Sequence, residues 1–134
     1  MESTIAALTR YQVKKFFSAS GRPTQDQCDR YAASATGEQP TAMAVQGGSS
    51  YTVAGAEVVV QFRAENAPLN LEFLHHVEQA YGNCMPWHTD SGKLGNLHVY
   101  TMRNVGGVSM YLARDSLQAN NCYHLRQTLT DFAR

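Results

Sequence analysis

This sequence lacks an excess of charge of either sign. Eleven basic residues balance eleven acidic ones among 134 residues. Only 16% of the residues are charged, against roughly 25% in a typical globular domain. Without a basic excess, neither nucleic acid nor a membrane is an expected partner. Copies of the chain repel one another little, which favours self-association.

Long apolar runs and paired cysteines are also missing. Apolar runs are short, as at Val58–Val60, and none approaches the ~18 residues of a membrane span. The start, Met1–Thr4, lacks the basic and apolar parts of a signal peptide. Cys28, Cys84 and Cys122 are odd in number and have neither C-x-x-C nor zinc-site spacing. They therefore predict free thiols, no metal and a cytoplasmic location.

Two helices are expected before any strand. Apolar residues recur at helical steps over 5–18. Thr24 is a suitable N-cap, and Gln27 stands at the capping-box position three residues later. A second helix is therefore predicted from there to about Ala35.

The periodicity then changes to that of a sheet. β-Branched residues and turn signals predict a meander of three strands, a packing helix capped by Asn70, two more strands and a last helix. This order predicts an α+β fold with an antiparallel five-stranded sheet. The expected elements are strands at 41–46, 51–53 and 58–63, a helix at 71–81, strands at 86–89 and 97–102, and a helix from 111. We expect a single domain, 1–134, made of a helical segment (1–38), the sheet with its helix (39–108) and a C-terminal helix (109–134).

Five segments carry a resemblance to a known family. They are Gly47–Val53, Val59–Arg63, Leu71–Leu74, His98–Met102 and Leu129–Arg134. In this order they resemble the N-terminal lobe of the aminoglycoside phosphotransferase and choline kinase-like family, which has a protein-kinase-like fold. The resemblance covers about residues 24–134 and is closest to fungal phosphotransferase-like members.

The resemblance implies a nucleotide cleft roofed by one face of the sheet. Gly47, Gly48 and Ser49 would form the nucleotide loop. The phosphate-pairing position aligns with Gln61, which is uncharged, and Arg63 lies two residues later on the same strand face and could substitute.

Two further segments would complete the family's cleft. The helix glutamate that pairs with the family's cation corresponds to Glu72. The strand 98–102 would lead to the hinge that binds adenine. Alternate residues of that strand, His98, Tyr100 and Met102, share one face.

The family's catalytic lobe would follow the hinge, and here the sequence ends first. On its own the chain is therefore not expected to transfer phosphate. His88-Thr89-Asp90 with Asn96 resembles the family's catalytic motif, but the spacing is one residue too long and the motif precedes the hinge. A turn at Asp90 is the preferred interpretation.

One predicted helix collects further titratable residues. Glu72, His75, His76 and Glu78 lie on it, and Glu72 and His75 are neighbours at a spacing of three. Such a pair suits acid–base chemistry. A solvated helix face is the favoured alternative.

These observations give one set of candidate site residues. An aromatic, histidine and arginine face on adjacent strands suits a small-molecule pocket. The candidates for catalysis are Glu72, Arg63 and His98. The candidates for ligand binding are Gly47, Gly48, Ser49, Tyr51, Gln61, Tyr100 and Met102.

Three hypotheses for function remain open. In the first, a stand-alone lobe binds or transforms a small metabolite by acid–base isomerisation, cyclisation or hydrolysis, as the fungal resemblance suggests for secondary-metabolite biosynthesis. In the second it is a nucleotide-binding pseudokinase or regulatory subunit, with ATP and magnesium as ligands. In the third it is a truncated, non-functional kinase fragment. The first requires no cofactor.

A lobe without its partner lobe exposes an apolar, cleft-facing surface. A homodimer or a second chain is therefore expected to cover it. The expected interface is the cleft face together with the C-terminal helix, through Tyr111, Leu112, Leu117, Tyr123, Leu125 and Leu129.

Overall fold

The computed structural model describes residues 2–82, 85–107 and 110–133. Its order of elements is the predicted one: two helices, three strands, a helix, two strands and a last helix. The α+β class with an antiparallel five-stranded sheet is confirmed. The elements are α1 (Thr4–Phe17), α2 (Gln25–Thr36), β1 (Thr41–Ala42), β2 (Ser50–Ala54), β3 (Val58–Arg63), α3 (Leu71–Tyr81), β4 (Thr89–Leu94), β5 (Leu97–Arg103) and α4 (Met110–Phe132).

Side-chain caps fix where the first three helices begin. Ser3 Oγ accepts the amide N–H of Ala6 at α1. Thr24 and Gln27 form the predicted capping box at α2, each side chain accepting the other's backbone N–H. Asn70 Oδ1 accepts the amide N–H of Phe73 at α3. These bonds satisfy amide groups that have no partner inside the helix.

The first strand is much shorter than predicted. β1 contains only Thr41 and Ala42, and residues 43–49 form a loop. The buried Gln46 explains the difference, because its amide donates to the carbonyls of Met43 and Thr52 and its oxygen accepts the Thr52 N–H. The side chain thus occupies the backbone groups that a longer ladder would use.

The fourth strand lies later than predicted. It begins at Thr89, where the expected strand 86–89 would end. The expected turn at Ser91 and Gly92 lies inside β4 instead, where the pairing with β5 shifts between Asp90 and Lys93. Residues 86–88 are therefore free to face α3.

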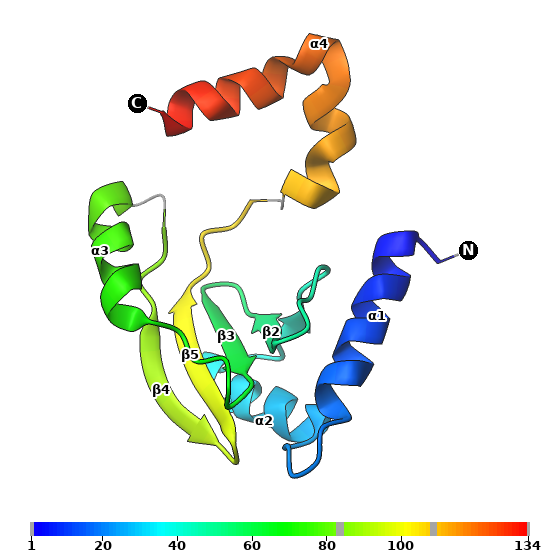
Figure 1. Ribbon diagram of the computed structural model, residues 1–134, viewed down its shortest axis with the longest axis vertical. Helices are drawn as coiled ribbons and strands as arrows, with labels where there is room; N and C mark the ends of the chain where they lie inside the picture. Colours follow the sequence, from blue (N-terminus) through cyan, green and yellow to red (C-terminus); the bar gives the residue numbers. More distant parts are fainter. Residues whose placement is uncertain (1, 83–84, 108–109, 134) are drawn as a thin grey trace.

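The sheet has the order β1-β2-β3-β5-β4 with antiparallel pairing throughout (Figure 1). Tyr51 pairs with Phe62, which pairs with Val99. Their neighbours Gln61 and Tyr100 also pair. Because side chains alternate along a strand, these two rows point to opposite faces.

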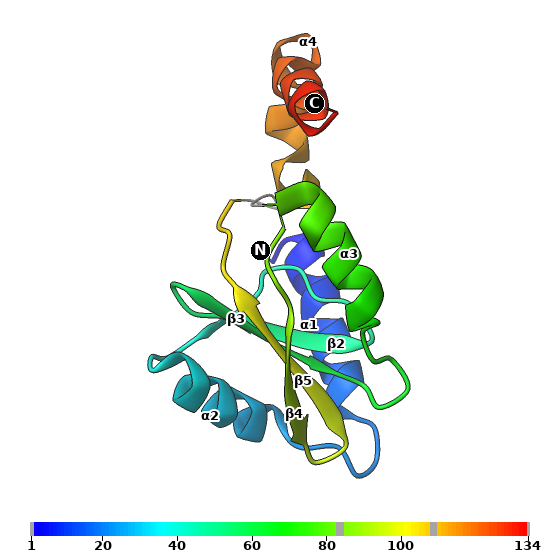
Figure 2. The ribbon, with the colours of Figure 1, turned by 90° about the vertical axis from the view of Figure 1, so that its left-hand side faces the viewer.

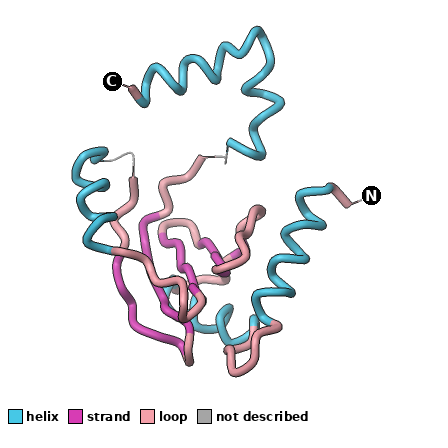
Figure 3. Tube along the Cα trace, in the orientation of Figure 1, coloured by secondary structure: helices cyan, strands magenta, loops and turns pink. Residues whose placement is uncertain are grey.

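One face of the sheet carries the apolar core. Phe16 of α1 and Cys28 and Ala32 of α2 pack in one cluster with the sheet. The strands lie between α3 and α1, as the tube in Figure 3 shows. The sheet residues of the cluster are Tyr51, Val53, Val60, Phe62, Leu97 and Val99, each at most 1% exposed.

The last helix stands apart from this core. Figure 1 and Figure 2 both place α4 beyond one end of the sheet, with α2 at the other end. α4 is bent at Ala119–Cys122, where the backbone is not helical. The predicted C-terminal helix is confirmed, but as two halves joined by a kink.

Candidate functional site

The register brings most of the predicted strand residues onto one surface. Thr52, Gln61 and Tyr100 are successive partners across β2, β3 and β5, and Arg63 is paired with His98. We call this surface the polar face and define it as Thr52, Gln61, Arg63, His98, Tyr100 and Met102. The expectation that Arg63 shares a face with Gln61 is confirmed by a 3.4 Å contact between Arg63 Nη1 and Gln61 Oε1.

The polar groups of this face are largely engaged by the chain itself. Residues 64–70, which we call the cover loop, run from β3 to α3. Arg63 Nε donates to the carbonyl oxygen of Ala67 at 2.7 Å, and the Tyr100 hydroxyl accepts the Leu69 N–H at 3.1 Å. His98 Nε2 lies 3.1 Å from the carbonyl oxygen of Glu65. These three side chains hold the cover loop to the sheet.

Gln61 and Met102 complete the polar face without reaching the cover loop. The Gln61 amide donates to Thr52 Oγ1 at 3.3 Å. Met102 is partly buried and pairs with Val59. Both residues lie on the face that the register predicts. The Gln61 amide is already bonded within the chain, by Thr52 and Arg63.

Tyr51 corrects the predicted ligand-binding set. It lies on the opposite, apolar face and is 1% exposed. Its hydroxyl donates to Asp29 Oδ1 at 2.7 Å and accepts from the Gln25 side chain at 3.2 Å. Tyr51 is paired with Phe62 across β2 and β3, and paired residues point to the same face of a sheet. Because Phe62 is a core residue, Tyr51 also faces the core.

The glycine loop is docked on α1. The hydroxyl of Thr9 donates to the carbonyl oxygen of Ala44, and a side chain at Gly48 would come within 3.1 Å of the Gln12 amide oxygen. Neither Gly47 nor Gly48 has a positive φ. The Ser49 carbonyl oxygen accepts the Ala64 N–H at 3.0 Å. A larger residue at position 48 would therefore require only a small movement of the Gln12 side chain, and no left-handed turn requires glycine there.

Glu72 stands away from the arginine that the resemblance pairs with it. It is exposed in the first turn of α3. Within the described ranges it forms no ion pair, whereas Arg63 bonds Ala67 and Gln61. Its place at the helix N-terminus suits the helix dipole.

A different glutamate of α3 is buried and bonded. Glu78 is 4% exposed. Its Oε1 accepts both the backbone N–H of His88 at 3.1 Å and His88 Nδ1 at 2.5 Å. The second oxygen, Oε2, is buried without a hydrogen bond and lies 3.8 Å from His75 Nε2. The predicted solvated face of this helix is thus wrong at Glu78.

These contacts select one tautomer for each neutral ring. Because Glu78 Oε1 is an acceptor, the proton of neutral His88 lies on Nδ1 and the lone pair lies on Nε2. His75 Nε2 lies 2.9 Å from the His88 carbonyl oxygen, so it carries the proton there. A carboxylate that fixes a histidine in one tautomer is an arrangement suited to proton transfer.

An aromatic platform adjoins this pair. The rings of His75 and Trp87 stack at 3.8 Å with an angle of 8° between their planes. Trp87 is 51% exposed, so one aromatic side chain beside His88 is open to solvent. We call Glu78, His88, His75 and Trp87 the α3 cluster.

Only one of the contacts in the α3 cluster could be predicted from the sequence. His75 and Glu78 have helical spacing of three, so their proximity was predictable. His88 lies ten residues beyond Glu78, and only the return of the chain along α3 brings it there. Cys84, in the same connection, lies outside the described residues.

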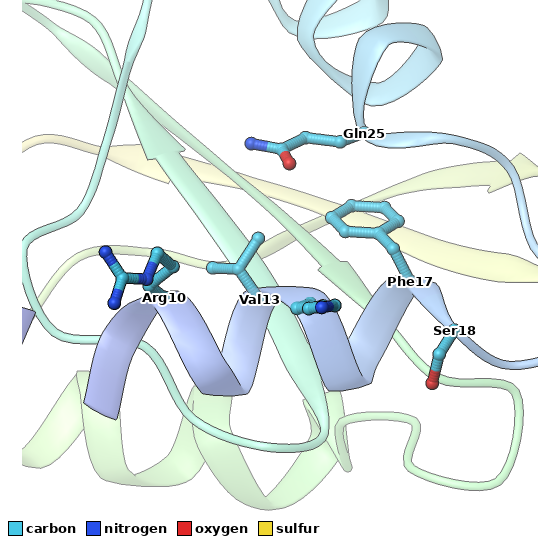
Figure 4. Close-up of a pocket in the computed structure, with 6 residues that line it drawn as sticks. Arg10, Val13, Phe17, Ser18 and Gln25 are labelled. Carbon is cyan, nitrogen blue, oxygen red and sulfur yellow. The ribbon is translucent and has the colours of Figure 1, made fainter. Parts of the chain in front are cut away.

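A pocket of about 600 Å³ lies elsewhere, between α1 and the start of α2. Figure 4 shows Val13 and Phe17 of α1 pointing toward Gln25 of α2. Arg10 and Lys14 add two cations to its lining, and Ser18 completes it. An organic anion with an apolar body matches this combination.

Burial controls the ionisation of two groups under the sheet. Burial raises the pKa of the Cys28 thiol from 9.0 to about 12, and the Asp29 carboxylate adds to the effect. Burial, followed by the hydrogen bond to Asp29, also raises the pKa of Tyr51 above its ordinary value of 10.0. Both groups are therefore neutral near pH 7, and Cys28 is a poor nucleophile.

No cluster of three or more metal-ligating side chains occurs within residues 2–82, 85–107 and 110–133. The described helices include none that is long and apolar enough to cross a membrane. Comparison of the sequence and structure with protein-family models, curated proteins and solved structures gives no match.

Proposed function

We propose that this protein binds a small organic molecule and transfers a proton on it, with His88 as the acid–base residue. The hydrogen bond between Glu78 Oε1 and His88 Nδ1 is the observation that carries the proposal. It leaves the lone pair of the neutral ring on Nε2, and the hydrogen bonds of His88 within the described residues involve only its carbonyl oxygen, its backbone N–H and Nδ1.

The class of ligand follows from the platform next to His88. A half-exposed indole stacked on an imidazole offers a flat apolar surface. Planar unsaturated molecules and the apolar face of a sugar stack on such a surface. The reaction would take a proton from carbon or oxygen of the ligand to Nε2 and return it, as isomerisation, cyclisation or hydrolysis requires.

Trp87 makes the proposal directly testable. It is the only tryptophan in the chain, so tryptophan fluorescence reports on the α3 cluster alone. We would titrate planar phenolic, enone and sugar compounds and follow that fluorescence. Compounds that bind would then be kept with the protein in D₂O, and loss of carbon-bound hydrogen would be followed by proton NMR.

Two variants separate binding from chemistry. His88→Gln is expected to retain binding and to slow deuterium exchange by about 10²-fold or more, because the base is removed. His76→Gln, on the exposed side of the same helix, is the matched control and should change neither. Absence of any compound that alters Trp87 fluorescence would refute the proposal, as would exchange that survives His88→Gln.

Membership of the kinase-like N-lobe family is part of this proposal. The meander, helix and two-strand order supports it. Nucleotide binding is the alternative within that family, and the engagement of Arg63 by Ala67 weighs against it. Calorimetry with ATP, with and without magnesium, separates the two: micromolar binding that is lost in Arg63→Gln would favour the alternative.

A second binding function is favoured by the α1–α2 pocket. Its volume and its pairing of Arg10 and Lys14 with apolar side chains suit a carboxylate such as decanoate. Lys14→Gln should weaken decanoate binding by a factor between about 1.4 and 5, the range for one exposed charge. Lys15→Gln is the control, since it changes the net charge equally outside the lining. Equal effects, or equal binding of decanol, would contradict a specific carboxylate site.

A further inference from the structure

The bend in α4 is the most unusual stretch of backbone in the described residues. Asn120, Asn121 and Cys122 have φ of 51°, 57° and 60°, which is the left-handed helical region. Asparagine visits this region more readily than most residues with a side chain, but as single residues, and three left-handed residues in succession are rare. No glycine relieves the bend.

The local sequence permits a bend at its two asparagines but does not require one. Residues 110–132 contain neither glycine nor proline, and a helix occupies each side of residues 119–122. A continuous helix of 23 residues is therefore the conformation that the segment alone would favour.

The bend is instead associated with a contact to the body of the protein. It returns the C-terminal half of α4 toward α3, where the rings of Phe132 and Tyr81 stack at 5.2 Å and 19° (Figure 1). Even so, Phe132 stays 66% exposed and Tyr81 43% exposed. Tyr123 and Leu129 on the same half are each 55% exposed. The closed arrangement therefore covers little apolar surface.

We propose that α4 straightens at Ala119–Cys122 and exchanges its C-terminal half with a second copy of the chain. Each Phe132 would stack on Tyr81 of the other copy, so that the contact of the closed chain is kept twice. The occupant is a second copy because it carries both halves of this contact. A two-fold exchange is closed and reciprocal, and the absence of net charge offers little repulsion.

Substitutions at Asn120 and Asn121, which we call the hinge residues, are expected to shift the dimer equilibrium in opposite directions. Asn120→Ala with Asn121→Ala favours the straight helix, and should lower the dimer dissociation constant by about tenfold or more. Asn120→Gly with Asn121→Gly removes the penalty of the left-handed conformation and should raise it by about tenfold. Light scattering after size exclusion, over a dilution series, measures both. Equal shifts, or none, would overturn the proposal.

A crosslink distinguishes exchange from side-by-side pairing. Tyr81→Cys with Phe132→Cys, in a background of Cys84→Ser and Cys122→Ser, places two thiols at the stacked positions. After oxidation of the dimer, a covalent dimer on a non-reducing gel is the expected result. A monomer with an internal disulfide, from a sample that was dimeric, would show that the halves are not exchanged.

The proposal is independent of the proton-transfer function. Tyr81 and the α3 cluster share one helix, but neither hinge variant alters a residue of the cluster. Trp87 fluorescence therefore serves as a control, and it should be the same in the alanine and glycine variants.

Discussion

The two faces of the one sheet are held by different forces. On the apolar face, α1 and α2 bury rings and aliphatic side chains: Phe16, Cys28 and Ala32 lie against Tyr51 and Phe62. On the polar face, Arg63, His98 and Tyr100 hold the cover loop by single hydrogen bonds to backbone groups. Because the apolar face buries more hydrophobic side chains, we expect it to contribute most of the stability of the sheet.

The sharpest way to break this comparison is to truncate neighbours on opposite faces of β3. Phe62→Ala should lower the free energy of unfolding by about 3–5 kcal/mol, because it removes a buried ring and leaves a cavity. Gln61→Ala, one residue earlier, should cost about 1–2 kcal/mol, the value of its long hydrogen bonds to Thr52 and Arg63. Urea unfolding measures both. Equal costs would mean that the two faces contribute alike.

The attachment of α3 is expected to have the next largest effect. Glu78→Ala leaves the Nδ1 and backbone N–H groups of His88 without their acceptor, which should cost about 2–3 kcal/mol. Glu72→Ala removes an exposed carboxylate of the same helix and should stay within about 0.5 kcal/mol. Thermal and urea unfolding would be compared for the two variants. A small effect of Glu78→Ala would show that α3 is held by other contacts.

Alkaline pH should weaken the apolar face selectively. The pKa of Cys28 is raised from 9.0 to about 12, so the stabilisation is complete below pH 9 and falls as the pH rises through that range. The expected slope is about 1.4 kcal/mol per pH unit for one group.

The alkaline prediction has its own control. In Cys28→Ala, Tyr51 is the only one of these two groups that still has a raised pKa. The ordinary pKa of a tyrosine is 10.0. The loss of stability should therefore begin one unit later, near pH 10 instead of pH 9. Urea unfolding at a series of pH values measures the onset. An unchanged onset would exclude Cys28 as the cause.

The smallest expected effect concerns the helix that covers the apolar face. Thr24→Ala removes the N-cap of α2 and half of its capping box, at a cost of about 1 kcal/mol. Thr24→Ser keeps the acceptor oxygen and should restore most of that loss. The midpoint of urea unfolding distinguishes the two. A full loss in Thr24→Ser would show that the methyl group, and not the cap, stabilises the helix.

Local signals in the sequence predicted most of the fold. Thr24 with Gln27 and the cap residue Asn70 mark helix starts that the structure has at the same residues. The run Val58–Arg63 is the central strand, as its β-branched residues predict. Where the prediction was wrong, at residues 43–46 and 86–88, side-chain hydrogen bonds between residues six and ten positions apart take the place of strand pairing.

The candidate site was less predictable. Period two placed Gln61, Arg63, His98 and Tyr100 on one face correctly, but it could not show that the cover loop binds three of them. Tyr51 was assigned to the ligand-binding set, although its register partner is the core residue Phe62.

By itself the sequence determined the α+β class, the order of the elements and the helix starts, because caps, turns and periodicity act within a few residues. Only the tertiary structure decided that Glu78 meets His88, that Tyr51 faces the core and that α4 bends where no helix breaker stands. Those outcomes depend on which segments of the chain come into contact. Burial and hydrogen bonding between residues of different segments determine these contacts.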